Sequence, residues 1–202
     1  CSRIFGIALA STGGVCRVHS PVEYSVGKSK VCGGIFMSKP SMRFMVPQDW
    51  EKIADIYGQG IATGIATFQT EVPSWDAWDA GHRKDARIVA EKDGEVIGFA
   101  TLSYVSAREC YRGVAEVSIY IDESARGQGV GKLLLSRLIL ISEELGIWTL
   151  QSSIDRENAA SIKLHESCGF RTIGFRERIA CIHKGAWRDT VLMERRSKSV
   201  GN

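Results

Sequence analysis

A loop with three alternating glycines, set between a strand and a helix, constrains the fold of this chain more than any other feature. Residues 114–121 alternate apolar and polar side chains, as half-buried strands do. The loop Arg126-Gly127-Gln128-Gly129-Val130-Gly131 follows, and apolar residues then recur at helical spacing. Glycines let backbone N–H groups converge, and a helix N-terminus carries partial positive charge. With Arg126 and Lys132 beside it, this loop predicts a phosphate site; the alternative is a plain turn into a helix.

The other segments predict a mixed α/β fold. Strands are expected over 42–46, 86–91, 96–104, 148–152, 171–182 and 190–194, with Asp93-Gly94 closing a hairpin. Helices are expected behind Pro47, behind Ser74 and over 158–168. In the helix after the glycine loop, the predicted apolar stripe is Val130, Leu133, Leu134, Leu138, Ile141 and Leu145. Strands and helices therefore alternate along one central sheet.

The charge distribution and the lack of a long apolar run argue against two classes of protein. Residues 1–40 carry five basic and one acidic side chain, a balance of +4, so the other 162 residues sum to −1. A nucleic-acid-binding domain would need a basic face, and a membrane helix needs about 18 apolar residues in a row. We therefore expect neither nucleic acid nor membrane as a partner.

Residues 1–40 are interpreted as a leader (a tag, mis-assigned upstream sequence or a disordered tail), 41–196 as the functional domain and 197–202 as a tail.

Neither the cysteines nor the histidines form a pattern typical of a metal site. Three of the six cysteines lie in residues 1–40, and no pair has C-x-x-C spacing. Reduced thiols are expected, as in a cytoplasmic protein. The spacing of His165, Cys168, Cys181 and His183 matches no familiar metal centre, so we predict no metal.

Two common phosphate loops do not match the glycine run. A Walker A loop needs G-x-x-x-x-G-K-[ST], but Arg126 stands at its first glycine and Leu133 follows Lys132. A dinucleotide fingerprint needs G-x-G-x-x-G in the first strand–helix unit, whereas this loop reads G-x-G-x-G and lies late in the chain.

The loop instead resembles the coenzyme A pyrophosphate motif, (Q/R)-x-x-G-x-(G/A), of the GNAT superfamily of N-acetyltransferases. Arg126, Gly129 and Gly131 match its fixed positions, and residues 158–170 resemble the superfamily's second motif, N-x-x-A/S…L-Y-E-x-x-G-F. The resemblance implies a mixed, mostly antiparallel sheet flanked by helices, and acetyl-CoA as co-substrate. The residues it implies for coenzyme binding are Ile119, Tyr120, Ile121, Arg126, Gly127, Gln128, Gly129, Val130, Gly131, Lys132, Asn158 and Ser161.

Further segments of residues 42–196 are similar to one subfamily, the phosphinothricin and methionine sulfoximine N-acetyltransferases. They are residues 67–71, 107–111, 115–116, 164–166 and 183–189. This resemblance implies N-acetylation of the α-amino group of a small amino acid or analogue. It also implies a cytoplasmic homodimer whose other partner is a small-molecule amine.

Direct acetyl transfer needs a deprotonated amine, and Glu116 matches the subfamily's proposed base, acting directly or through a water. His165 stands where most of the superfamily has a tyrosine, so it is expected to serve the departing thiolate. Arg108 is expected to bind a substrate anion. The full set expected to bind the acceptor is Phe68, Ser106, Ala107, Arg108, Tyr111, Glu116, Val117 and Ser118. Each could instead be structural: Glu116 and Arg108 as solvated side chains, and His165 as a helix histidine.

Two other functions stay open. An acetyltransferase for a protein N-terminus, a lysine or a polyamine would use the same fold with another acceptor. A non-catalytic acyl-CoA sensor would keep the glycine loop but transfer nothing. Loss of transfer with retained coenzyme binding in a Glu116 variant separates an enzyme from a sensor.

Overall fold

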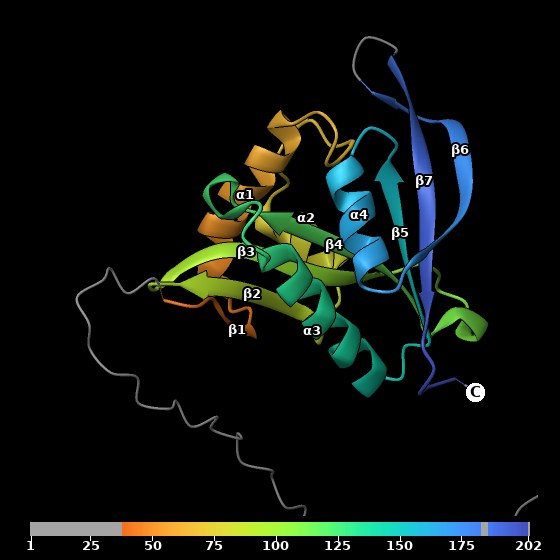
Figure 1. Cartoon of the computed structure of the whole chain (residues 1–202), viewed down its shortest axis with the longest axis horizontal. Helices are drawn as coiled ribbons and strands as arrows, with labels where there is room; N and C mark the ends of the chain where they lie inside the picture. Colours follow the sequence, from red (N-terminus) through yellow and green to blue (C-terminus); the bar gives the residue numbers. More distant parts are fainter. Residues whose placement is uncertain (1–37, 183–185, 202) are drawn as a thin grey trace, which may run out of the picture. The chain divides into compact units, whose positions relative to one another are not determined.

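A computed structural model describes residues 38–182 and 186–201 (Figure 1). Residues 1–37 of the predicted leader, residues 183–185 between the last two strands and residue 202 lie outside the described residues. The strands are β1 (Ser41–Phe44), β2 (Arg87–Lys92), β3 (Glu95–Tyr104), β4 (Val114–Ile121), β5 (Thr149–Asp155), β6 (Arg171–Ile182) and β7 (Ala186–Arg196). The helices are α1 (Trp50–Ala62), α2 (Trp75–Gly81), α3 (Val130–Glu144) and α4 (Ala159–Ser167), with short 3-10 turns at Pro47–Asp49, Glu109–Tyr111 and Glu123–Ala125.

The strands form one sheet in the order β1-β2-β3-β4-β5-β7-β6, in which β4–β5 is parallel and the other pairs are antiparallel. The predicted α/β class and mostly antiparallel sheet are confirmed. At the predicted hairpin, Asp93 and Gly94 both have positive φ, 54° and 86°. Two such residues between paired strands make the tight turn whose twist matches that of the strands.

Two apolar layers cover the faces of the sheet because strand side chains alternate. Ile88 and Leu102 point to the layer that contains α3, whereas Val89 and Phe99 point to the layer of α1 and α2. The stripe predicted for α3 needs correction at its edges. The structure also buries Leu135 and Ile139, while Leu145, past the end of the helix, is 37% exposed. The buried face of α3 is wider than a single stripe because the helix packs on β2, β3 and β4 (Figure 1).

Strand β4 separates from β5 near the middle of its length. Their pairing runs from Val114↔Thr149 to Glu116↔Gln151 and ends there. Beyond Glu116, the β5-facing edge of β4 has no strand partner among residues 38–182 and 186–201. The separation leaves backbone groups of residues 117–121 free for a ligand. Glu116 lies where the gap between the two strands begins.

The last residues of the chain pack back on the domain. Ser197 is buried, its N–H donates to the carbonyl of Trp148 (2.8 Å), and its hydroxyl donates to Glu143 (2.9 Å). The described part of the predicted tail, residues 197–201, therefore begins with a residue that helps hold the end of α3.

Candidate functional site

The glycine loop borders open space at two of its three glycines. Gly127 and Gly129 have positive φ, 73° and 83°, and a Cβ added to either would meet no atom within 4 Å. Gly131 differs, because its Cβ would lie 3.1 Å from the Leu164 side chain. Gly129 caps the N-terminus of α3. Two glycines thus shape an open cradle, and the third lets α3 approach α4.

A buried carboxylate anchors this loop to α1. Asp122 accepts hydrogen bonds from the backbone and hydroxyl of Ser124 and from Lys52 (2.9 Å). Gln59 accepts from the N–H of Glu123 (2.8 Å). Burial alone would raise the pKa of Asp122, but these hydrogen bonds outweigh it and hold the pKa well below its usual range. Asp122 therefore stays charged at neutral pH and keeps the loop fixed.

The loop borders a cavity of about 530 Å³. Of the residues predicted to bind the coenzyme, eleven line it: Ile119, Tyr120, Ile121, Arg126, Gly127, Gly129, Val130, Gly131, Lys132, Asn158 and Ser161. Gln128 does not, because its side-chain amide turns back to donate to the Ser124 carbonyl (2.7 Å). Asn158 caps α4 through the N–H of Ser161 and also donates to the carbonyl of Ile65, so it ties the helix to the opposite wall.

A second cavity, of about 340 Å³, continues from the first, and we call it the acceptor cavity. Four of the residues predicted to bind the acceptor, Phe68, Glu116, Val117 and Ser118, line it together with His165. The two cavities share six lining residues: Ile65, Ala66, Ile119, Tyr120, Asn158 and Ser161. A ligand in the glycine-loop cavity can therefore extend along the free edge of β4 toward Glu116.

Glu116 stands half-buried at the end of this passage. The side-chain amide of Gln151 donates to its Oε2 at 3.3 Å. No ion pair of Glu116 is present among the described residues, whereas Asp155, on the same cavity, is held by Arg188 at 2.7 Å. Glu116 therefore presents an uncompensated carboxylate to whatever enters the acceptor cavity.

His165 is 1% exposed, and its ring is oriented by its own helix. Its Nδ1 lies 2.8 Å from the carbonyl of Ser161, and since a carbonyl only accepts, Nδ1 carries the ring proton. Its Nε2 is buried without a hydrogen-bond partner in the described chain. Burial lowers the pKa of His165, although the Ser161 carbonyl opposes this. In this neutral form Nε2 accepts, so His165 must gain a proton before it can give one to a thiolate.

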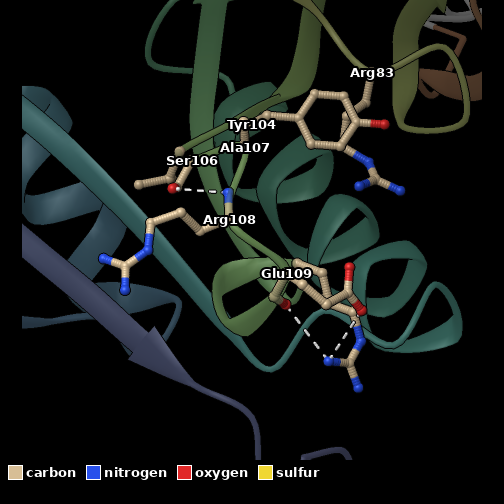
Figure 2. Close-up of a pocket in the computed structure, with 8 residues that line it drawn as sticks. Arg83, Tyr104, Ser106, Ala107, Arg108 and Glu109 are labelled. Atoms are coloured by element: carbon tan, nitrogen blue, oxygen red, sulfur yellow. Dashed lines mark hydrogen bonds and ion pairs between the residues drawn. The ribbon is translucent and has the colours of Figure 1, made fainter.

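The other predicted acceptor-binding residues lie elsewhere. Ser106, Ala107 and Arg108 line a separate open cavity of about 610 Å³ with Arg83 and Arg112 (Figure 2). The guanidinium of Arg108 lies over the ring of Tyr111, 5.3 Å from its centroid, and Tyr111 itself is exposed. Within this chain, the structure does not bring Arg108 together with Glu116.

Several residues of the acceptor cavity are not among the predicted site residues. These are Tyr57, Thr67, Gln69, His82, Ser152, Ser153 and Asp155. Tyr57 lies in the helix predicted behind Pro47, and residues 67–69 belong to a segment that resembles the subfamily. Nothing local marked His82, which reaches the cavity because α2 packs on β3 through Trp78 and Phe99.

Two further findings concern the described part of the chain. None of its helices is both long and apolar enough to cross a membrane. No group of three or more His, Cys, Asp or Glu side chains in it is placed to hold a metal ion. His183, one of the residues considered for a metal, lies outside the described residues.

The chain is similar to known acetyltransferases in sequence and in structure. Residues 50–170 match the model of the acetyltransferase (GNAT) family. Phosphinothricin N-acetyltransferase of Alcaligenes faecalis is 37% identical over 77% of this chain and 81% of its own. The L-methionine sulfoximine/L-methionine sulfone acetyltransferase of Salmonella typhimurium is 28% identical over 76% and 92%. A solved phosphinothricin acetyltransferase from Sinorhizobium meliloti, in complex with AcCoA, has a TM-score of 0.70 and 33% identity over 78% and 88%.

Proposed function

This chain belongs to the acetyltransferase (GNAT) family and is an acetyl-CoA-dependent N-acetyltransferase, and from that premise we propose that it acetylates the α-amino group of a small amino acid or analogue. The observation that carries the proposal is the passage from the glycine loop to Glu116, along which the two cavities share six residues. Such a passage lets a thioester and an amine meet at the free edge of β4.

The residues around the glycine loop fit the diphosphate of the coenzyme. The open cradle at Gly127 and Gly129 offers backbone N–H groups at the N-terminus of α3, and Arg126 and Lys132 add positive charge. The free edge of β4 supplies backbone groups for the pantetheine arm. An N–H near Ile119 is the proposed donor to the oxyanion that forms at the thioester carbonyl.

The acceptor cavity fits a cationic amine with a neutral side chain. Glu116 attracts the ammonium group and takes its proton, directly or through a water. Hydroxyl groups, including that of Ser118, line the same cavity, whereas Arg108 lies outside it. Methionine sulfone and methionine sulfoximine have neutral side chains, whereas phosphinothricin carries a phosphinate anion. We therefore propose the sulfone and the sulfoximine as better acceptors than phosphinothricin.

The proposal is tested by following thiol release from acetyl-CoA with a panel of amines. The panel contains methionine sulfone, methionine sulfoximine, phosphinothricin, ordinary amino acids, spermidine and a lysine peptide. We expect the fastest release with the sulfone or sulfoximine. Turnover with spermidine or the peptide alone would overturn the acceptor class, and bound coenzyme without turnover of any amine would indicate a sensor.

Replacing Gly129 by Ala is expected to weaken coenzyme binding. The added Cβ enters the open cradle, and at a φ of 83° an L-residue costs about 1–2 kcal/mol of stability. There the methyl group keeps the diphosphate away from a backbone N–H of the loop. The loss of that charge-assisted hydrogen bond raises the Kd for coenzyme A roughly 10- to 100-fold. Gly94→Ala is the matched control, because Gly94 has a φ of 86° and equally open surroundings but lies in the hairpin turn. Both variants should lose similar stability in urea unfolding, and calorimetry should find a raised Kd for Gly129→Ala alone.

We also propose a cytoplasmic homodimer. Phe175 and Ile179 on the edge strand β6, and Trp187 on β7, are each more than half exposed, and such apolar surface supports a protein contact. The described cysteines, Cys110, Cys168 and Cys181, form no disulfide, which supports a reducing compartment. Light scattering on the purified protein measures the oligomeric state directly.

A further inference from the structure

His82 is a titratable side chain of the acceptor cavity that the proposed function does not use, and its ring is fixed on two sides. The imidazole stacks on Trp78 with centroids 4.3 Å apart, and its Nδ1 lies 2.7 Å from the Trp78 carbonyl. Because a carbonyl only accepts, Nδ1 carries the ring proton and Nε2 keeps a free lone pair. No hydrogen bond to this Nε2 occurs in the described part of the chain. The ring is therefore held in one tautomer with its acceptor nitrogen unused.

The backbone under His82 is equally constrained. The buried Arg87 donates to the carbonyls of His82 (2.6 Å), Asp79 (2.8 Å) and Arg83 (3.0 Å), so one guanidinium satisfies the C-terminal end of α2. Arg87 also pairs with the Asp79 carboxylate at 2.6 Å. Arg87 therefore fixes the backbone at His82, while the His82 ring itself binds the Trp78 carbonyl through Nδ1 and leaves Nε2 available.

His82 and Glu116 line the same cavity from different elements, the end of α2 and strand β4. We propose that His82 Nε2 is a second proton acceptor for the acceptor amine, acting beside the carboxylate of Glu116. The inference rests on the proposed function insofar as the acceptor enters as an ammonium group in this cavity. Glu116 then attracts the ammonium by charge, while the neutral Nε2 of His82 offers a second lone pair that can accept its proton.

The protons and electrons of this step balance. An N–H bond of the ammonium breaks, its electron pair stays on nitrogen, and a new Nε2–H bond forms on His82. The nitrogen lone pair then attacks the thioester carbonyl, the C–N bond forms, and the C–S bond breaks with its pair on sulfur. The adduct nitrogen loses its second proton while the sulfur gains one. His82, which is half-exposed, returns its proton to solvent, so each turnover releases one proton.

The surroundings of His82 favour the neutral form that this step needs. Burial lowers the pKa of His82, and the positive charge of Arg87 lowers it further. The hydrogen bond to the Trp78 carbonyl and the negative charge of Asp79 raise it, but less. The titratable or charged side chains that face it from the packed elements and across the cavity are Tyr57, Asp79, Arg87, Glu116, Asp155 and His165. The net result is an imidazole that stays unprotonated at neutral pH and is ready to accept.

Two variants separate proton transfer from packing. His82→Gln keeps an acceptor oxygen that cannot hold a proton, and His82→Phe keeps the ring stacked on Trp78 without a nitrogen. We expect both to lower kcat/KM for methionine sulfone at pH 7 by about 10²-fold. Thiol release is measured from mildly acidic pH to one unit above the pKa of the acceptor amine. There about nine-tenths of the substrate is already deprotonated, and both variants should approach wild-type rates. The loss should also be smaller for an amino-acid amide, whose amine is less basic than that of the free amino acid.

The controls distinguish the possible failures. The Kd for coenzyme A of both variants should match the wild type, because His82 does not line the glycine-loop cavity. A lower Tm is expected for both, since each loses either the stacking on Trp78 or the hydrogen bond to its carbonyl, so rates are compared at a temperature where both variants are folded. A His82→Gln variant with wild-type rates at pH 7, or a loss that is the same at every pH and for every amine, would overturn the inference. If the wild type does not use methionine sulfone, the proposed acceptor is wrong, and the same comparison is made with the amine that the panel identifies.

Discussion

Glu116→Gln is expected to lower kcat/KM for acetyl transfer by about 10²–10⁴-fold, the usual effect of removing a positioned proton acceptor. The substitution keeps the size of the side chain but removes the charge that attracts the ammonium group. Stopped-flow or steady-state thiol release measures the loss. Since Glu116 does not line the glycine-loop cavity, the Kd for coenzyme A should not change.

The control for this variant is Glu95→Gln. Glu95 is an exposed carboxylate at the start of β3, and it lines none of the three cavities. This change should leave kcat, KM and coenzyme affinity unaltered. A fully active Glu116→Gln variant would show that the carboxylate neither takes the proton nor holds the amine.

Leu138→Ala is expected to destabilise the domain by about 2–5 kcal/mol, the range for large-to-small changes at buried leucines. Leu138 is 0% exposed and belongs to the apolar cluster between α3 and the sheet. Removing three of its carbon atoms leaves a cavity between two rigid layers that cannot close fully. Urea unfolding followed by tryptophan fluorescence measures the change in free energy.

Leu140→Ala is the matched control on the same helix. Leu140 lies two residues further along α3 and is 52% exposed, so its truncation creates no internal cavity. We expect a change within about 0.5 kcal/mol. Equal losses for the two variants would contradict the buried face assigned to α3.

Most of the fold could be predicted because its signals are local. The Asp93-Gly94 turn, the alternation along residues 114–121 and the glycine loop each depend on neighbours within a few positions. Eleven of the twelve residues expected to bind the coenzyme line the glycine-loop cavity for the same reason, since they lie in the two motifs and on the adjoining strand. Gln128 is the exception, because whether its amide faces the cavity or the Ser124 carbonyl depends on a rotamer.

The acceptor side was predictable only in part. Glu116 could be placed because strand alternation sets its face. Arg108 could not be placed, since the path of residues 105–113 between β3 and β4 depends on packing against Arg83 and Trp148. The roles available to His165 and His82 depend on which ring nitrogen is bonded. In both residues Nδ1 binds the backbone carbonyl four residues earlier, and only folding brings that carbonyl within reach.

The sequence alone determined the order of strands and helices along the chain, the glycine loop proposed to hold the coenzyme and the position of Glu116 on the strand before it. Those features follow from backbone geometry and side-chain alternation over short stretches. Tertiary structure alone decided that β4 leaves β5 at Glu116 and that residues of α1, α4 and the segment 65–69 line the cavity there, with His82 included and Arg108 excluded. These outcomes depend on how elements distant in the chain pack around the sheet, and no local pattern encodes that packing.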